Sequence, residues 1–191
     1  MRKFFISFTA CLSSIILCFS LAACSGPSTI NPERLKIDKA YSFNADIKYG
    51  DFSAEGVLER KSAGVWTITL SEPFALQGVV MTYEQGTLTA YFESLPTPQV
   101  LPELENKSNS VIELIVGAFE NAINGEGREA ISFGDKVKIS SRAGNPPKPY
   151  ELMFDKQSLE PLTLSIPDKS LTAEFSEVQV SQIVQVILPS E

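Results

Sequence analysis

Residues 41–58 read YSFNADIKYGDFSAEGVL, a run in which apolar and polar side chains alternate on both sides of a glycine. Its apolar members on one predicted face are Tyr41, Phe43, Ala45, Ile47, Tyr49, Phe52, Ala54 and Leu58. Successive side chains of a strand point to opposite faces, so a period of two predicts two half-buried strands. Gly50-Asp51 between them is typical of a tight turn. The run therefore predicts an antiparallel hairpin with one apolar face.

The same alternation recurs before and after one helical segment. Before it, strands are predicted around Trp66–Leu70, at Leu76–Tyr83 and at Thr87–Glu93; after it, at Lys136–Ser141, Tyr150–Asp155, Pro161–Ile166 and Leu171–Ser176, with Val178–Leu188 as one more strand or a packed tail. The helix is predicted from apolar residues at helical spacing, namely Val111, Leu114, Ile115, Ala118, Phe119 and Ala122. Ser110 and Glu113 have capping-box spacing, and Asn124-Gly125 is a typical helix end.

These elements predict a mainly β (α+β) fold. A helix is about 10 Å wide and strands lie about 4.8 Å apart, so one helix covers two or three strands. The remaining apolar face requires a curled antiparallel sheet, or half-open β-barrel, with the main helix packed on its concave face. The aromatic residues of that face either form plain core or line a ligand cavity. The cavity candidates are Tyr49, Phe52, Trp66, Phe92, Phe119, Phe154 and Phe175.

The N-terminus has the order of a secretory signal. Arg2 and Lys3 precede an apolar stretch, and Leu21-Ala22-Ala23-Cys24 follows. This tetrapeptide resembles the lipobox of bacterial lipoproteins, which implies cleavage before Cys24 and attachment of palmitate-type acyl chains to its sulfur. About 20 apolar residues also suffice to span a bilayer, so an uncleaved anchor is the alternative. We expect a signal peptide at 1–23, a lipidated tether at 24–38 and a single β domain at 39–191.

Composition excludes several kinds of chemistry. The 191-residue chain has no histidine, and its 16 Lys and Arg stand against 23 Asp and Glu, a net charge of −7. Without histidine there is no Ser-His-Asp or Cys-His site and no imidazole metal ligand. The acidic balance argues against nucleic-acid binding. Residues 24–191 carry a net charge of −9 and one cysteine, so a disulfide within the chain is excluded. We expect no cofactor and no metal.

Paired carboxylates offer the main catalytic alternative. Glu55 and Glu59 share a strand face, as do Glu151 and Asp155, and paired carboxylates perform glycoside hydrolysis. Both pairs lie on the predicted polar face, where solvation is their ordinary role. The chain has no Ser-x-x-Lys motif and no Asp-x-Asp-x-Asp-Gly calcium loop. We therefore expect no enzyme and no catalytic residue.

The order of aromatic, glycine and proline positions carries a family resemblance. It comprises Phe43-x-Ala45-x-Ile47, Gly56-Val57-Leu58, Trp66-x-Ile68 leading to Pro73, Val80 to Tyr83, Gly86-x-Leu88, Tyr91-Phe92, Tyr150-x-Leu152-x-Phe154-Asp155, Pro161-Leu162-x-Leu164-x-Ile166 and Phe175-Ser176. From about Ala40 to Ser176 the chain resembles the LolA/LolB superfamily of lipoprotein-localisation factors and the related mycobacterial lipid-carrier lipoproteins. The resemblance implies an eleven-strand half-open barrel that holds acyl chains, and the lipid anchor resembles the LolB side.

The sequence therefore predicts an extracytoplasmic lipoprotein that binds a hydrophobic ligand without catalysis. The ligand would be an acyl chain, a lipid or a lipidated protein, and the membrane would be the partner of the Cys24 anchor. In an organism with an outer membrane, that membrane is a further place for the anchor. The alternative is an interaction or structural lipoprotein of the cell envelope with a self-packed core and no small-molecule ligand.

Overall fold

The structure is a computed structural model that describes residues 26–35, 37–84, 86–92 and 111–181. The strands are β1 Ser28–Ile30, β2 Ala40–Tyr49, β3 Phe52–Ser62, β4 Val65–Glu72, β5 Val79–Glu84, β6 Thr87–Phe92, β7 Glu129–Phe133, β8 Lys136–Ala143, β9 Lys148–Asp155, β10 Pro161–Ile166 and β11 Leu171–Ser181. The α-helix is α2 Val111–Asn124, and the 3-10 turns are η1 Pro32–Arg34, η2 Phe74–Leu76 and η3 Pro167–Lys169. No helix within these ranges is both long and apolar enough to cross a membrane.

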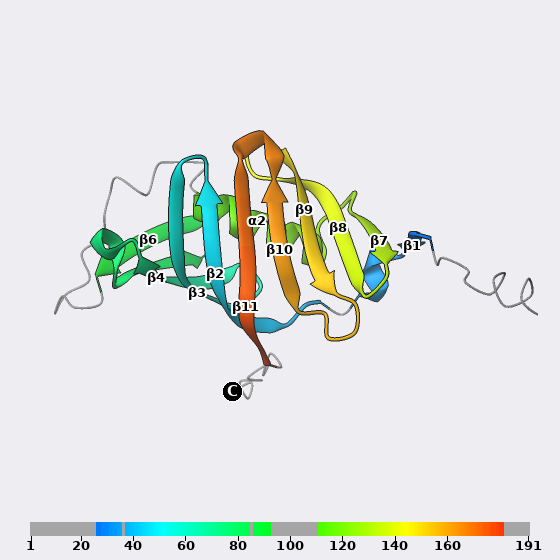
Figure 1. The fold of residues 1–191 in the computed structure, drawn as a ribbon, viewed down its shortest axis with the longest axis horizontal. Coiled ribbons are helices and arrows are strands. Elements are labelled where there is room, and N and C mark those ends of the chain that lie inside the picture. The colour runs from blue at the N-terminus through cyan, green and yellow to red at the C-terminus, as the bar shows by residue number, and fades with distance from the viewer. Residues whose placement is uncertain (1–25, 36, 85, 93–110, 182–191) are drawn as a thin grey trace, which may run out of the picture.

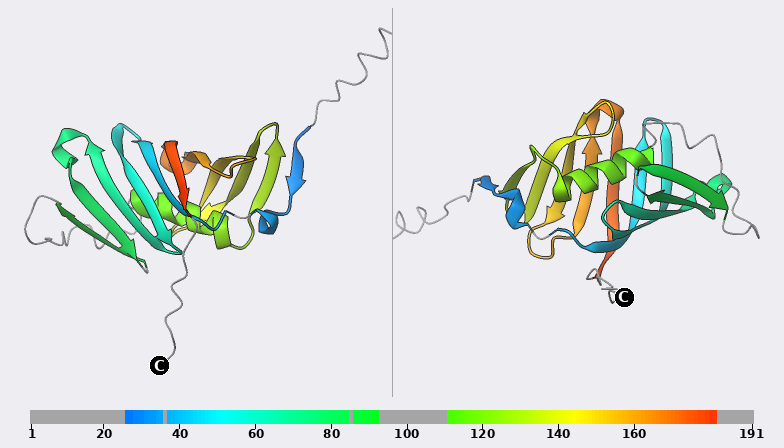
Figure 2. Two further views of the ribbon diagram at one scale, coloured as in Figure 1. Left: turned by 90° about the horizontal axis from the view of Figure 1, so that it is seen from below. Right: turned by 180° about the vertical axis from the view of Figure 1, so that it is seen from behind.

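The eleven strands of the described chain form one open antiparallel sheet. Their order is β1-β7-β8-β9-β10-β11-β2-β3-β4-β5-β6. Two meanders, β2 to β6 and β7 to β11, are joined where β11 pairs with β2, with Phe175 opposite Ala45. The sheet curls around α2, which lies across its concave side (Figures 1 and 2). The predicted fold class, a curled antiparallel sheet with one helix on the concave face, is confirmed.

The helix lies on the concave face because of the connection that contains it. β6 ends at one edge of the sheet and β7 begins near the other, so the chain crosses the sheet between them. Eight of the 14 residues of α2 are buried, and the helix contacts β8 and β9 directly. Arg128, just after the helix, donates hydrogen bonds to the carbonyl oxygens of Ala122 and Ile123 in its last turn. Those carbonyls have no partner within the helix, so Arg128 caps it.

The core occupies the space between the concave face and α2. In β2, buried residues alternate with half-buried ones from Ala40 to Ile47, and β3 repeats the pattern. The alternation of residues 41–58 therefore corresponds to one inner and one outer face. Gly50-Asp51 forms the predicted turn, and Gly50 has a positive φ of 59°.

Two strands were not predicted from the sequence. Ser28 and Thr29, which lie in the predicted tether, belong to β1, and β1 pairs with the equally unpredicted β7. Later in the same segment, Asn31 caps η1 by accepting from the backbone N–H of Glu33 at 3.0 Å, as its sequence position indicates. β11 continues through Val178 to Ser181. The signal, Cys24, the cap residue Ser110 and the tail beyond 181 lie outside the described residues.

Candidate functional site

Aromatic rings from four elements meet beneath α2. Phe43 of β2, Trp66 of β4 and Phe175 of β11 surround Phe119 of the helix. The rings of Phe43 and Phe119 are stacked with their centroids 5.5 Å apart. The ring centroids of Trp66 and Phe119 are 5.2 Å apart. Phe175 lies 4.8 Å from Phe43 and 5.4 Å from Phe119. These are distances at which aromatic pairs attract each other, so the cluster attaches α2 to both halves of the sheet.

The seven predicted cavity residues divide by depth. Trp66, Phe119 and Phe154 are at most 1% exposed, and Phe175 is 8% exposed. Trp66, Phe119 and Phe175 belong to the aromatic cluster, whereas Phe154 lies in the core on β9. Tyr49 and Phe92 are half-buried against that core.

Phe52 has the alternation of an inner-face residue but is 43% exposed. It begins β3 and pairs with Tyr49 beside the turn between β2 and β3. Its side chain therefore lies at the rim of the sheet rather than in the interior.

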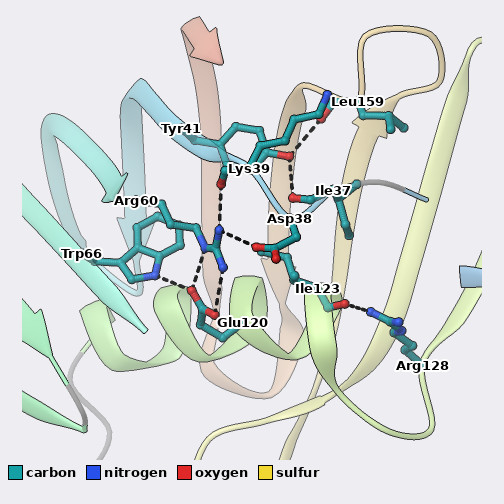
Figure 3. A network of polar contacts seen from close by, with 10 residues as sticks. All are labelled: Ile37, Asp38, Lys39, Tyr41, Arg60, Trp66, Glu120, Ile123, Arg128 and Leu159. Carbon is teal, nitrogen blue, oxygen red and sulfur yellow. Dashed lines mark hydrogen bonds and ion pairs between the residues drawn. The ribbon is translucent and has the colours of Figure 1, made fainter. Parts of the chain in front are cut away.

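A buried arginine, which was not among the predicted site residues, joins the helix to the sheet. The side chain of Arg60 on β3 has no exposed surface. Its Nε donates to Oε1 of Glu120 at 2.8 Å and its Nη2 to Oε2 at 3.3 Å, a bidentate pair. Its Nη1 donates to the Asp38 carboxylate at 3.0 Å and to the Lys39 carbonyl at 2.7 Å. Trp66 Nε1 donates to the same Glu120 oxygen at 2.8 Å (Figure 3).

This network retains the charge of Arg60 in spite of its burial. Burial alone lowers the pKa of the guanidinium, but the hydrogen bonds and negative charges of Glu120 and then Asp38 outweigh it, and the pKa is raised. The network also reaches the segment before β2, because Tyr41 donates to the carbonyl of Ile37 at 2.9 Å. Burial raises the pKa of the Tyr41 phenol, so this hydroxyl stays a donor at neutral pH.

Polar residues of α2 act on two tyrosines of the sheet. Burial, followed by the charges of Glu113 and Glu120, raises the pKa of the Tyr83 phenol on β5. Tyr150 of β9 donates its hydroxyl hydrogen to Oδ1 of Asn121 at 2.8 Å. The helix therefore combines a broad apolar face with a short polar strip, and the strip is hydrogen-bonded to the sheet.

Arg60 has a detectable signal in the sequence. It continues the inner-face series Ala54, Gly56 and Leu58 of β3, so a charge stands where the alternation expects an apolar side chain. A buried charge requires a partner, and that requirement identifies the position as special. The partners themselves lie 22 and 60 residues away along the chain, and nothing in the local pattern indicates them.

Apolar side chains make up most of the interior beneath α2. The carboxylates of Glu120 and Asp38 are both bonded to Arg60. In the described ranges, no three Asp, Glu, His or Cys side chains lie close enough to hold a metal ion. The hollow lined by Asn44, Asp46, Glu55 and Glu174 lies on the outer face, as does the neighbouring hollow at Glu72 and Pro73.

Several solved structures are similar to this chain, and two of them are described here. No family model matches the chain, and no curated protein matches it. A LolA superfamily protein from Nitrosomonas europaea is similar with a TM-score of 0.39 and 10% identity, over 78% of this chain and 89% of that one. A DUF1329 family protein from Desulfovibrio piger is similar with a TM-score of 0.33 and 9% identity, over 79% and 87% of the two chains.

Proposed function

We propose that this protein is an extracytoplasmic lipoprotein that binds a hydrophobic ligand in its half-open barrel without catalysing a reaction. The ligand class is an acyl chain, a lipid or a lipidated protein. The observation that carries the proposal is the apolar concave face of an open sheet, covered by one helix. The lipobox-like sequence ending at Cys24 supports the membrane anchor.

The interior provides the affinity in this proposal. Burial of apolar surface contributes about 25 cal/mol per Å², so an acyl chain gains by replacing part of the contact between α2 and the sheet. Phe119 and the aromatic rings around it form the contact to be replaced. An incoming acyl chain therefore binds when α2 shifts away from Phe43 and Trp66. The acyl chain leaves when the helix returns.

The Arg60 network sets the resistance to this movement. Lifting α2 separates Glu120 from a guanidinium that has no exposed surface. Leaving a buried charge unpaired is costly, so the ion pair favours the closed position. A ligand must therefore supply enough apolar burial to offset the loss of this pair.

Two measurements test the proposal. Residues 25–191 are purified, and bound lipid is sought by mass spectrometry of the extract. Uptake of a fluorescent fatty acid is then compared between the wild type and Glu120→Gln, with Asp38→Asn as the matched loss of a carboxylate that is more exposed. We expect co-purified lipid and faster uptake by Glu120→Gln than by either of the others. Absence of both lipid and uptake in the folded wild type would contradict the proposal.

The anchor is tested separately on the full chain. We expect Cys24→Ala to move the protein from the membrane to the soluble fraction and to remove an acyl modification from the N-terminal peptide of the mature chain. Membrane association that persists unchanged in Cys24→Ala would instead favour an uncleaved span.

The packing of the aromatic cluster favours a second candidate, an interaction or structural lipoprotein with a self-packed core. Phe43, Trp66 and Phe119 are at most 1% exposed, and their rings already pack against one another. In that case α2 is permanent core, and the protein works through its outer surface. Hydrogen exchange separates the two candidates: amides of α2 as protected as those of β2 and β3 favour permanent packing, whereas earlier exchange of α2 favours the binding protein.

A further inference from the structure

The position of β1 fixes how close the domain lies to its proposed anchor. β1 begins at Ser28, four residues after Cys24. Four residues of extended chain reach at most about 14 Å, and the headgroup layer of one leaflet is about 6 Å thick. An acylated Cys24 therefore leaves the β1 edge of the sheet within reach of the lipid headgroups.

The register shows which part of this edge meets the membrane. Ser28 pairs with Ser132 and Ile30 with Ala130 in an antiparallel ladder. The chain upstream of Ser28 therefore runs toward the end of β7 at which Phe133 lies. β1 and β7 form one end of the long axis of the molecule, with β5 and β6 at the other end (Figure 1).

At this end, the outer face of the sheet carries apolar side chains between lysines. Ile131 and Phe133 point outward from β7, because Ala130 and Ser132, which alternate with them along the strand, are buried. Lys138 of β8 pairs with Ile131, Lys136 pairs with Phe133, and Met153 of β9 lies opposite Lys138. We call these five residues the anchor-side patch: Ile131, Phe133, Lys136, Lys138 and Met153. Phe133 is 37% exposed.

The two lysines of the patch differ in their ion pairing. Lys138 is paired with Glu151 at 2.8 Å, and Asp155 accepts hydrogen bonds from Gln157 and Ser158. Lys136 is exposed and makes no ion pair within the part of the chain that the structure describes. Lysines with apolar stems favour the membrane–water interface, and interfacial segments insert phenylalanine among the headgroups.

The opposite half of the outer face is more acidic than the anchor side, where Glu129, Glu151 and Asp155 share the outer face with Lys136 and Lys138. Glu174, Asp46 and Glu55 lie directly opposite one another on β11, β2 and β3, and Glu72 on β4 continues the row. An anionic bilayer repels such a row and attracts lysines. Charge therefore favours the same orientation that the short connection to Cys24 imposes.

We propose that the anchor-side patch rests on the headgroups of an anionic bilayer, with Phe133 inserted among them, and that this contact orients the open barrel on the membrane. The proposal rests on the lipid anchor of the proposed function. A domain held by acyl chains alone would tumble about its tether, whereas the patch fixes which face meets the lipid. The β5–β6 end and the outer face of β3 then point away from the bilayer.

The test uses the full lipidated protein in vesicles of phosphatidylethanolamine and phosphatidylglycerol that contain some lipid with a nitroxide on its headgroup. The acylated Cys24 leaves an introduced cysteine as the free thiol of the mature chain. A fluorophore is attached to Phe133→Cys, to Met153→Cys, which retains Phe133, or to Val57→Cys. Val57 is the matched control, because it is also 37% exposed on the outer face but lies on β3.

We expect strong quenching of the label at positions 133 and 153 and only background quenching at position 57. Adding Phe133→Ser to the protein labelled at position 153 should lower the quenching there toward background. Equal quenching at 153 and 57 in protein that floats with the vesicles and carries the acyl mass would overturn the patch and leave the anchor standing. Protein that neither floats nor carries acyl chains would overturn both.

Discussion

Arg60 and Glu120 form a bidentate ion pair between β3 and α2, at 2.8 Å for Nε to Oε1, and the arginine side chain is completely buried. The second carboxylate partner of Arg60, Asp38, is 57% exposed at its side chain, against 23% for Glu120. The guanidinium of Arg60 is therefore bound by one largely buried carboxylate, Glu120, and one largely exposed carboxylate, Asp38. The buried side of the network belongs to the helix, and the solvated side belongs to the segment before β2.

Removing Glu120 should cost far more than removing Asp38. Glu120→Ala leaves the buried guanidinium without its bidentate partner, for which we expect a loss of about 3 to 5 kcal/mol in the free energy of unfolding. Asp38→Asn removes a largely exposed charge and should cost about 0 to 1 kcal/mol. Urea unfolding of both variants measures the difference. Equal losses would contradict this, because they would show that Asp38 contributes as much as Glu120 to holding Arg60.

The aromatic cluster predicts a second contrast in stability. Phe119→Ala empties the space between Phe43, Trp66 and Phe175, and such truncations cost about 3 to 5 kcal/mol. Phe74→Ala makes the same chemical change on η2, where the ring is 84% exposed, and should stay within about 0.5 kcal/mol. Thermal or urea unfolding separates the two. A small effect of Phe119→Ala would mean that α2 repacks freely, which would favour a movable helix.

The alternation along the chain was sufficient to predict most of the sheet, but it missed β7. In most strands the inner side chains are apolar and the outer ones polar. β7 departs from this order, because Ala130 and the polar Ser132 face inward while the large apolar residues Ile131 and Phe133 face outward. β1 has only three residues and exists as a strand through its pairing with β7. A three-residue segment is too short for a period to be recognised, so β1 carried no usable pattern. In β7 the adjacent apolar residues Ala130 and Ile131 interrupt the alternation.

The candidate site could be predicted only in part, because periodicity gives the face of a side chain but not its depth. Trp66 on the concave face is fully buried beneath α2, whereas Phe52 shares the parity of the buried positions and still lies at the rim. Depth depends on where along the strand the helix crosses. The pairing of Arg60 with Glu120 depends on the same crossing, which the tertiary arrangement sets.

Two glycines should respond in opposite directions to alanine. At Gly56 on β3, a Cβ would lie 2.4 Å from the backbone oxygen of Thr69, so β3 or β4 must shift. We expect Gly56→Ala to cost about 1 to 3 kcal/mol, as overpacked positions do. At Gly117 in α2, the nearest atoms to a Cβ would be 3.8 and 3.9 Å away, in ordinary contact.

Gly117→Ala should therefore stabilise the protein by about 0.5 to 1 kcal/mol, because alanine loses less backbone entropy than glycine in a helix. The two variants make the same chemical change, so a difference in sign reports on the space around each Cβ together with the helical propensity at position 117. Melting temperatures of the pair, measured under one condition, test it. A loss at position 117 would mean that α2 packs more tightly against Ala143 and Gly144 than these distances allow.

The turn after β9 gives a pH-dependent prediction. Oδ1 of Asp155 accepts hydrogen bonds from the backbone N–H groups of Ser158 and Gln157, both at 2.8 Å. These bonds, that of Ser158 first, hold the pKa of the Asp155 carboxyl below its ordinary value of 3.8. Since folding lowers this pKa, the resulting stability is fully present above about pH 4 and is lost as the pH falls through the folded-state value.

Asp155→Asn should remove this contribution, so that its free energy of unfolding falls less steeply than that of the wild type as the pH drops from about 4 to about 2. Urea unfolding across this interval, with Asp135→Asn as a control for the loss of one negative charge, measures the slope. An NMR titration of the Asp155 carboxyl in the wild type checks the cause, because the midpoint must lie below 3.8. An ordinary midpoint would mean that the Ser158 and Gln157 hydrogen bonds do not persist in solution, and the slopes of the two variants should then coincide.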